Sequence, residues 1–170
     1  MIVGMCLLGM TTWAQSTKRV CDTIHYEFVQ NKIIIPVTVN GVVVKYIVDT
    51  GGQTGTVREY AAEMKAMQGM GVRGVSDVNG MSLSYEEAVL KDVQLSPNYK
   101  LAQMKSIIFP PNGFFRELGV AGILGSDAFA QTVVTFDAQN KLMVINYPYR
   151  PAGLKITDGV PFYPGGANHP

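Results

Sequence analysis

The chain of 170 residues has few of the side chains that most often bind metals or form crosslinks. It contains two cysteines, Cys6 and Cys21, and two histidines, His25 and His169. Residues so few and so scattered match neither the spacing of a zinc site nor a disulfide framework. The sequence therefore predicts a protein that needs no metal ion or other cofactor, with a core stabilised by packing alone.

Charged residues are also scarce, and neither sign dominates. They make up 16% of the chain, with 14 basic against 13 acidic side chains and a formal net charge of +1. The chain has no run of Lys or Arg, which excludes the positive surface that a nucleic-acid partner requires. A hydrophobic content of 47% predicts one ordinary folded domain rather than a disordered chain.

The first ten residues form an apolar run that is too short for a transmembrane helix, which needs roughly 20 apolar residues. Small residues, Thr12 and Ala14, stand three and one positions before a cleavage point after Ala14. This pattern is typical of a signal peptide and predicts export to the periplasm or the cell exterior, without membrane contact after cleavage. The alternative is a buried N-terminal strand.

Beyond this run, the alternation of apolar and polar residues is typical of β-strands. Ile33–Val39 and Val42–Val48 flank the pair Asn40-Gly41, which readily adopts the positive φ angles of a type I′ turn and so predicts a hairpin. Asn79-Gly80 predicts a second hairpin in the same way, between strands at 72–78 and 81–93.

One amphipathic helix and three more strands complete the predicted pattern. Apolar residues recur at helical spacing over Val57–Met67. The strands are predicted at Met104–Phe109, Thr132–Phe136 and Leu142–Asn146, and prolines and glycines break regular structure from Pro148 onward. The predicted organisation is a signal peptide (1–14), a lead-in segment (15–27), one domain (28–147) and a Pro- and Gly-rich tail or linker (148–170).

The residues that carry chemistry stand where the first predicted hairpin ends. An apolar strand runs directly into Asp49-Thr50-Gly51, which delivers a carboxylate at a tight turn where backbone N–H groups can hold it. Far downstream, two aliphatic residues and a glycine follow each other in Ile123-Leu124-Gly125. In this order the two motifs resemble the pepsin and retropepsin superfamily of aspartic peptidases, specifically the single-lobe retropepsin-like kind. The likeness extends from Phe28 to about Tyr147.

This resemblance implies a mainly β fold: a retropepsin-like closed β-barrel lobe with one short amphipathic helix and a flap hairpin over the substrate. It implies that Asp49 is the catalytic aspartate and that the Thr50 hydroxyl ties the active-site loop to its counterpart. Gly51 would permit the turn of the loop. Gly52 stands where the family commonly has Ser or Ala, so that a hydroxyl hydrogen bond to the carboxylate is missing.

The resemblance also implies that the downstream motif, Ile123-Leu124-Gly125, supports the loop that carries Asp49. Ile123, Leu124 and Gly125 would form a strand threaded beside the loop, and a side chain at Gly125 would collide with the segment that carries Asp49. The implied activity is that of an aspartic endopeptidase, in which two carboxylates share one proton and activate water against a peptide bond. With a single Asp-Thr-Gly in the chain, the second aspartate is expected from an identical chain in a homodimer or from a second lobe. The alternative is a catalytically incomplete module that binds peptides or serves a structural role.

Three further interpretations stay open on the sequence alone. In the first, Asp49 has no catalytic role and only caps a turn between a strand and a helix. Asp127 is predicted to cap the short turn at 128–131 rather than to act as a second catalytic group. The segment Gly51–Thr56 has the glycines of a phosphate-binding loop, but it lacks Gly-Lys-Ser/Thr, and Asp49 would repel a phosphate.

Overall fold

The computed structural model describes residues 20–76, 80, 82–130 and 132–147, so the predicted signal peptide and tail lie outside the described residues. Its elements follow in the order β1 (Val20–His25), β2 (Glu27–Val29), β3 (Lys32–Val39), β4 (Val42–Val48), β5 (Gly55–Val57), α1 (Arg58–Glu63), β6 (Val72–Ser76), β7 (Ser82–Gln94), β8 (Lys100–Phe109), α2 (Gly113–Leu118), β9 (Gly122–Leu124), the 3₁₀ helix η1 (Ser126–Phe129), β10 (Val133–Asp137) and β11 (Leu142–Tyr147).

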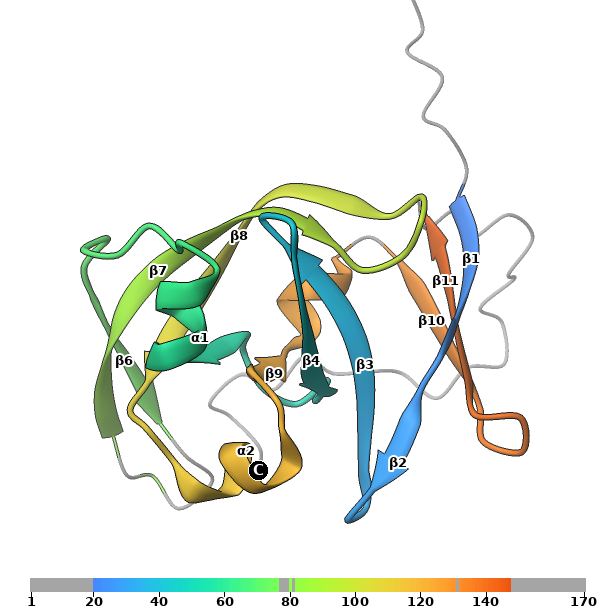
Figure 1. Ribbon diagram of the computed structural model, residues 1–170, viewed down its shortest axis with the longest axis horizontal. Helices are drawn as coiled ribbons and strands as arrows, with labels where there is room; N and C mark the ends of the chain where they lie inside the picture. The colour runs from blue at the N-terminus through green and yellow to red at the C-terminus, as the bar shows by residue number, and fades with distance from the viewer. Residues whose placement is uncertain (1–19, 77–79, 81, 131, 148–170) are drawn as a thin grey trace, which may run out of the picture.

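Most strands belong to one sheet that closes on itself. The strand order is β2-β3-β4-β9-β5-β8-β7-β6, and β3 pairs in addition with β7 through Thr38↔Gln94 and Val39↔Val93. This extra pairing joins β3, β4, β9, β5, β8 and β7 into a ring, which confirms the predicted mainly β barrel. The remaining strands form a three-stranded sheet of order β1-β11-β10, which lies at the right of the molecule in Figure 1.

The hairpin of β3 and β4 forms as predicted. The strands pair antiparallel up to Val39↔Val42, and the two turn residues have positive φ angles, 48° at Asn40 and 80° at Gly41. Those angles match the right-handed twist of the flanking strands, which explains the preference for Asn-Gly at this position. The hairpin therefore fixes the direction in which the end of β4 leaves the barrel.

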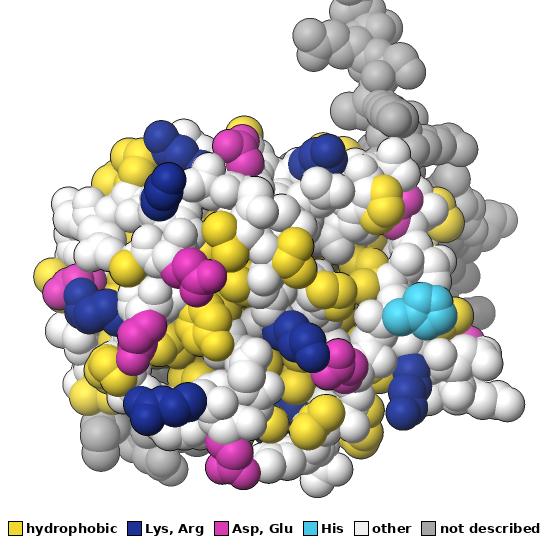
Figure 2. Space-filling model, in the orientation of Figure 1, with side chains coloured by type: hydrophobic (Ala, Val, Ile, Leu, Met, Phe, Trp, Pro, Cys, Tyr) yellow, Lys and Arg dark blue, Asp and Glu magenta, His cyan; other side chains and the backbone are white. Residues whose placement is uncertain are grey.

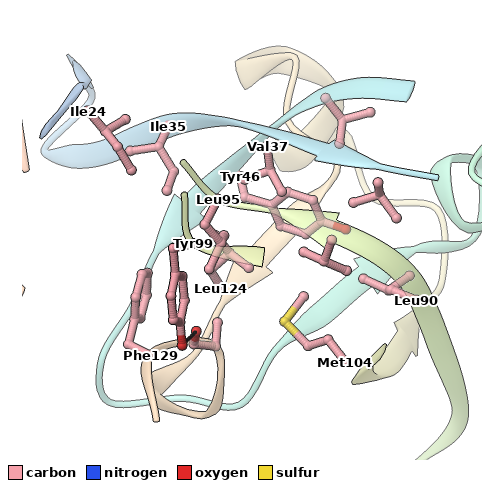
Figure 3. Packing of buried hydrophobic residues seen from close by; sticks show 14 of the residues in the cluster. Ile24, Ile35, Val37, Tyr46, Leu90, Leu95, Tyr99, Met104, Leu124 and Phe129 are labelled. Carbon is pink, nitrogen blue, oxygen red and sulfur yellow. Dashed lines mark hydrogen bonds between the residues drawn. The ribbon is translucent and has the colours of Figure 1, made fainter. Parts of the chain in front are cut away.

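The core fills the interior of the ring. Figure 3 shows Tyr46 from β4 and Leu124 from β9 among side chains contributed by β3, β7 and β8. Tyr46 and Leu124 are both fully buried, as is Ile35 on β3. Because β4 and β9 contribute side chains to this packed interior, their ends are held in place by a large apolar contact.

The helices differ from the prediction of a single helix over Val57–Met67. Helix α1 covers only Arg58–Glu63, because Val57 pairs with Phe109 of β8 while Met67 forms an isolated bridge to Val89. The expectation of one helix was also wrong, since the structure has a second helix, α2.

The sequence contains a local signal for helix α2, an asparagine before its first residue and a glycine after its last. Its N-cap, Asn112, accepts a hydrogen bond from the Phe114 N–H at 2.8 Å, and its C-cap, Gly119, has the left-handed conformation that favours glycine. Helices α1 and α2 face each other across a cavity of about 300 Å³, whose lining includes Tyr60 and Phe115.

The folded body includes part of the predicted lead-in segment, 15–27. Strand β1 pairs with β11 from Val20↔Tyr147 to His25↔Leu142. The buried Asp22 carboxylate accepts hydrogen bonds from Ser96 Oγ at 2.6 Å and Asn98 N at 2.7 Å, which joins β1 to the β7–β8 connection.

The predicted second hairpin is present as β6 and β7, although most of its turn, 77–79, lies outside the described residues. The strands pair from Val72↔Glu86 to Ser76↔Ser82, and β6 forms the edge of the sheet in the described part. In the face shown in Figure 2, charged side chains of both signs are interspersed with apolar ones. Among the described residues, no helix combines the length and apolar character needed to cross a membrane.

Candidate active site

The loop that carries Asp49 connects β4 to β5 and passes over the end of a third strand. Strand β9 lies between β4 and β5: it pairs parallel to β4 through Val48↔Leu124 and antiparallel to β5 through Gly55↔Ile123. The loop therefore begins and ends on neighbours of the same short strand, as the resemblance implied for Ile123 and Leu124. Gly125 was expected in this strand as well, but it follows β9 as the N-cap of η1. Sequence periodicity could not have found β9, because three residues are too few to show a pattern.

Asp49 leaves β4 with its backbone still bonded to β9 and its side chain exposed. The Asp49 N–H donates to Leu124 O at 2.9 Å, which continues the β4–β9 pairing by one residue. The Asp49 carboxylate accepts the Gly51 N–H at 3.0 Å through Oδ1. The expectation that a nearby backbone N–H holds this carboxylate is met, and the carboxylate remains accessible to a ligand or to a second chain.

Of the three residues after Asp49, Gly51 and Gly52 lie close to its carboxylate. Gly51 does not have a positive φ; a Cβ there would lie 3.4 Å from Asp49 Oδ1, in contact with the carboxylate. A Cβ at Gly52 would lie 3.6 Å from Asp49 Oδ2, so the structure has room for the Ser or Ala that the family commonly has. Thr50 is exposed, and its side chain makes no hydrogen bond to other described residues.

Gly125 allows the loop to pass directly against the end of β9. A Cβ at this position would lie 2.4 Å from Gly52 O and 2.5 Å from Gln53 C, distances at which backbone atoms would have to move. The predicted collision is therefore confirmed. In addition, the Ser126 N–H donates to Gly52 O at 3.3 Å, so the same close approach is used for a hydrogen bond.

Asp127 has a different role from the one predicted. The prediction that it caps the short turn at 128–131 was wrong, because Asp127 lies within η1 (Ser126–Phe129), which has Gly125 at its N-cap and no side-chain cap bond. Instead, Asp127 Oδ1 accepts two hydrogen bonds from Thr54, from N at 3.0 Å and from Oγ1 at 2.8 Å. These residues are far apart in sequence, so no local pattern could have indicated the contact.

Two of the other interpretations conflict with the geometry. A phosphate loop needs free N–H groups, but those of Gly51, Gly52 and Thr54 donate to Asp49 Oδ1, Asp49 O and Asp127 Oδ1. Asp49 does not cap a helix either, because β5 separates it from α1, which has Val57 at its N-cap. In the described part of the chain, His, Cys, Asp and Glu side chains form no group of three or more able to hold a metal ion.

Beneath the loop, buried hydroxyl groups connect the strands that carry it. The Tyr46 hydroxyl on β4 lies 2.9 Å from Thr56 Oγ1 on β5, which lies 2.8 Å from Ser106 Oγ on β8. Burial raises the pKa of Tyr46 far above its usual value, and the hydrogen bond between Tyr46 and Thr56 offsets only part of this effect. The two strands that flank the loop are thus joined by neutral hydrogen bonds inside the core.

Comparisons with known proteins agree with this geometry. The fold is similar to that of a retropepsin-like aspartic protease from Rickettsia conorii in its crystal structure, with a TM-score of 0.53 and 18% sequence identity over 80% of this chain and 98% of that chain. At this identity the likeness shows the fold alone. No curated protein matches the sequence. The family model described as aspartyl protease matches residues 35–128, which include the Asp49 loop, β9 and Asp127. This match covers more than half of the chain, and the protein therefore belongs to the aspartyl protease family.

Proposed function

We propose that the protein is an aspartic endopeptidase in which Asp49 is the catalytic carboxylate. The observation that carries this proposal is the exposed Asp49 side chain on a loop that β9 holds in place from below. Among the described residues, the Asp49 carboxylate accepts a hydrogen bond from the Gly51 N–H alone, through Oδ1, which leaves Oδ2 available for a water molecule. Membership of the aspartyl protease family supports the same assignment.

The proposed reaction needs a second aspartate, which an identical chain or a second lobe supplies. One ionised carboxylate takes a proton from water as the water oxygen attacks the peptide carbonyl carbon, and the other carboxyl gives its proton to the carbonyl oxygen. The resulting tetrahedral diol then loses its C–N bond. The leaving nitrogen receives the proton that the first carboxyl took from water. One diol hydroxyl gives a proton to the second carboxylate, so both carboxyl groups regain their starting protonation states.

A homodimer is the arrangement that we favour for this pair. Asp127 is a poor candidate for the second carboxylate, because its Oδ1 already accepts two hydrogen bonds from Thr54. Asp49 and Thr50 are both exposed in the single chain, which is the condition for meeting their counterparts across a two-fold axis. In this arrangement the Thr50 hydroxyl reaches the loop of the partner, and extended peptides bind between the two chains.

The first experiment compares Asp49→Asn with Asp92→Asn, a control at another exposed aspartate on β7. Cleavage of an unstructured protein substrate at mildly acidic pH should disappear in Asp49→Asn and persist in the control, and a pepstatin-type inhibitor should block the wild type. The substitution removes the charge that deprotonates water but preserves the shape of the side chain. Cleavage that survives Asp49→Asn would exclude Asp49 from the mechanism.

The second experiment tests the dimer. Specific activity measured beside sedimentation over a dilution series should fall as the dimer dissociates. Excess Asp49→Asn chain mixed with the wild type should suppress activity, because mixed dimers hold one carboxylate. A monomer with activity independent of concentration would place the second carboxylate within this chain. A wild type that binds peptides but cleaves none at any concentration would establish the alternative, an incomplete peptide-binding module.

We also propose that residues 1–14 direct export to the periplasm or the cell exterior and are then removed. The apolar first ten residues and the small residues before the cleavage point support this. Intact-mass analysis of protein from a host with the same export pathway should give a mature N-terminus at Gln15. A mature protein that retains Met1 would contradict the proposal.

A further inference from the structure

The far end of the Asp49 loop is fixed at one buried residue, Thr54. Only 1% of Thr54 is exposed, and each of its polar groups has a partner. The N–H and the hydroxyl both donate to Asp127 Oδ1, at 3.0 and 2.8 Å. The hydroxyl oxygen accepts the Gly125 N–H at 3.1 Å, and the carbonyl oxygen accepts the Ile107 N–H at 3.0 Å. Thr54 therefore connects the loop to β8 and to the segment after β9.

Asp127 is the acceptor for both donors of Thr54. Without that carboxylate, a buried N–H and a buried hydroxyl would lose their shared partner, which is costly enough to favour movement of the backbone toward water. The near end of the loop has a separate anchor, the Asp49 N–H bonded to Leu124 O. Between these two anchors stand Gly51 and Gly52, which have no side chains to restrain the path. Between the anchors, the loop has one further bond to the segment after β9, from the Ser126 N–H to Gly52 O at 3.3 Å. The position of the loop therefore depends on its bonds to β9 and to the segment after it, which includes Asp127.

We propose that Asp127 is a positioning residue that sets the Asp49 carboxylate for catalysis by holding Thr54. The inference rests on the proposed peptidase function, which it deepens by assigning a residue that acts on the reacting group from a distance. Asp127 contacts neither the water nor the peptide bond in this role. Because a single oxygen accepts both hydrogen bonds, the role requires an acceptor and not a negative charge.

This requirement separates Asp127 from a catalytic carboxylate. An asparagine at position 127 retains an oxygen that can accept from both donors of Thr54, whereas an alanine does not. A catalytic aspartate, in contrast, loses its function on substitution by asparagine, as we expect for Asp49. Asp137 provides a matched control, since it also accepts two hydrogen bonds, from Asn140 N at 3.0 Å and Asn140 Nδ2 at 2.7 Å, but lies at the end of β10 in the other sheet.

The experiment measures kcat and KM for the full chain carrying Asp127→Ala, Asp127→Asn or Asp137→Ala. Asp127→Ala should lower kcat about 10- to 100-fold with KM changed less than about twofold, because a displaced carboxylate impairs the chemical step more than peptide binding. Asp127→Asn should retain kcat within about threefold, and Asp137→Ala should match the wild type. If Asp127→Ala does not fold, Thr54→Val compared with Thr54→Ser replaces it, with the loss of kcat expected for valine alone.

A second readout does not depend on activity. The amide signals of Gly51 and Gly52 in a ¹⁵N–¹H correlation spectrum should move in Asp127→Ala and stay in place in Asp127→Asn and Asp137→Ala. An Asp127→Asn variant as inactive as Asp49→Asn would overturn the inference in favour of a catalytic Asp127. Unchanged glycine signals and unchanged kcat in Asp127→Ala would overturn it as well. An inactive wild type whose glycine signals still move in Asp127→Ala would refute the peptidase proposal while supporting the anchoring of the loop by Asp127.

Discussion

The two Asn-Gly hairpins of this protein share a local signal and differ in their surroundings. Strands β3 and β4 pair with each other and also with neighbours on both sides, β2 and β7 for β3 and β9 for β4. In the β6–β7 hairpin, the residues from Ser82 to Tyr85 pair with β6 alone, so that this part extends beyond the ring, at the left of Figure 1.

Burial follows the same division. Ile35 and Tyr46 in the first hairpin are fully buried, whereas Val72 and Leu83 in the second are 70% and 48% exposed. The turn sequence therefore builds a hairpin in either place, but only the neighbours decide whether it is rigid. Asp49 follows the first hairpin, which is paired with neighbouring strands and buried, whereas the described part of the β6–β7 hairpin beyond the ring is exposed. Matched substitutions in the two hairpins test this difference.

The largest expected effect comes from truncating one apolar side chain in each hairpin, buried Ile35 and exposed Leu83. Ile35→Ala should lower the free energy of unfolding by about 4 kcal/mol, because it removes buried methyl groups and leaves a cavity. Leu83→Ala should change it by less than about 0.5 kcal/mol, since that side chain is half exposed. Urea unfolding followed by circular dichroism measures both. Equal losses would show that the β6–β7 hairpin is packed as firmly as the first.

Adding a methyl group should lower stability at the Asp49 loop but not in the exposed β6–β7 hairpin. Gly125→Ala should cost about 3 kcal/mol and reduce any peptidase activity, because the new Cβ would lie 2.4 Å from Gly52 O. Gly74→Ala on β6 should be neutral or stabilise by about 0.5 kcal/mol, since nothing lies within 4 Å of a Cβ there. Thermal unfolding is the measurement, and a well-folded, stable Gly125→Ala would contradict the close approach of the loop to β9.

Removing one hydroxyl from each hairpin should give a smaller difference. Tyr46→Phe should lower the free energy of unfolding by about 1 kcal/mol through loss of the hydrogen bond to Thr56, which keeps its contact with Ser106. Tyr85→Phe should have an effect below about 0.5 kcal/mol, because the Tyr85 hydroxyl makes no hydrogen bond to other described residues. A Tyr46→Phe variant as stable as the wild type would show that the buried hydroxyl chain contributes nothing net.

The smallest expected effect appears only at alkaline pH. Because burial raises the pKa of Tyr46 above the value of about 10 in the unfolded chain, its contribution to stability is complete below pH 10 and is lost as the pH rises toward the folded pKa. From pH 10 to pH 10.5 the wild type should lose about 0.4 kcal/mol more than Tyr46→Phe. Parallel pH dependences for the two proteins in urea unfolding would show that Tyr46 ionises equally in both states.

Local patterns accounted for the elements that are long or that have a distinctive turn. The β3–β4 hairpin follows from alternation and from Asn40-Gly41, because both the side-chain period and the turn angles are properties of neighbouring residues. Helix α1 was predicted too long, because its apolar spacing continues through residues that pair with other strands: Val57 with β8 and Met67 with Val89. Those pairings involve distant segments, and helical periodicity does not report them.

The sequence by itself determined the mainly β character, the first hairpin and the identity of Asp49 as the candidate catalytic residue. The β character and the hairpin depend on residue types and on spacings within a few positions, whereas Asp49 was identified because Asp49-Thr50-Gly51 and the distant Ile123-Leu124-Gly125 together resemble a known family. Only the tertiary structure decided that β9 pairs with both β4 and β5, and that Asp127 holds Thr54 instead of capping the short turn at 128–131. Such contacts depend on where the closed ring brings distant backbone segments together, and no local pattern encodes that distance.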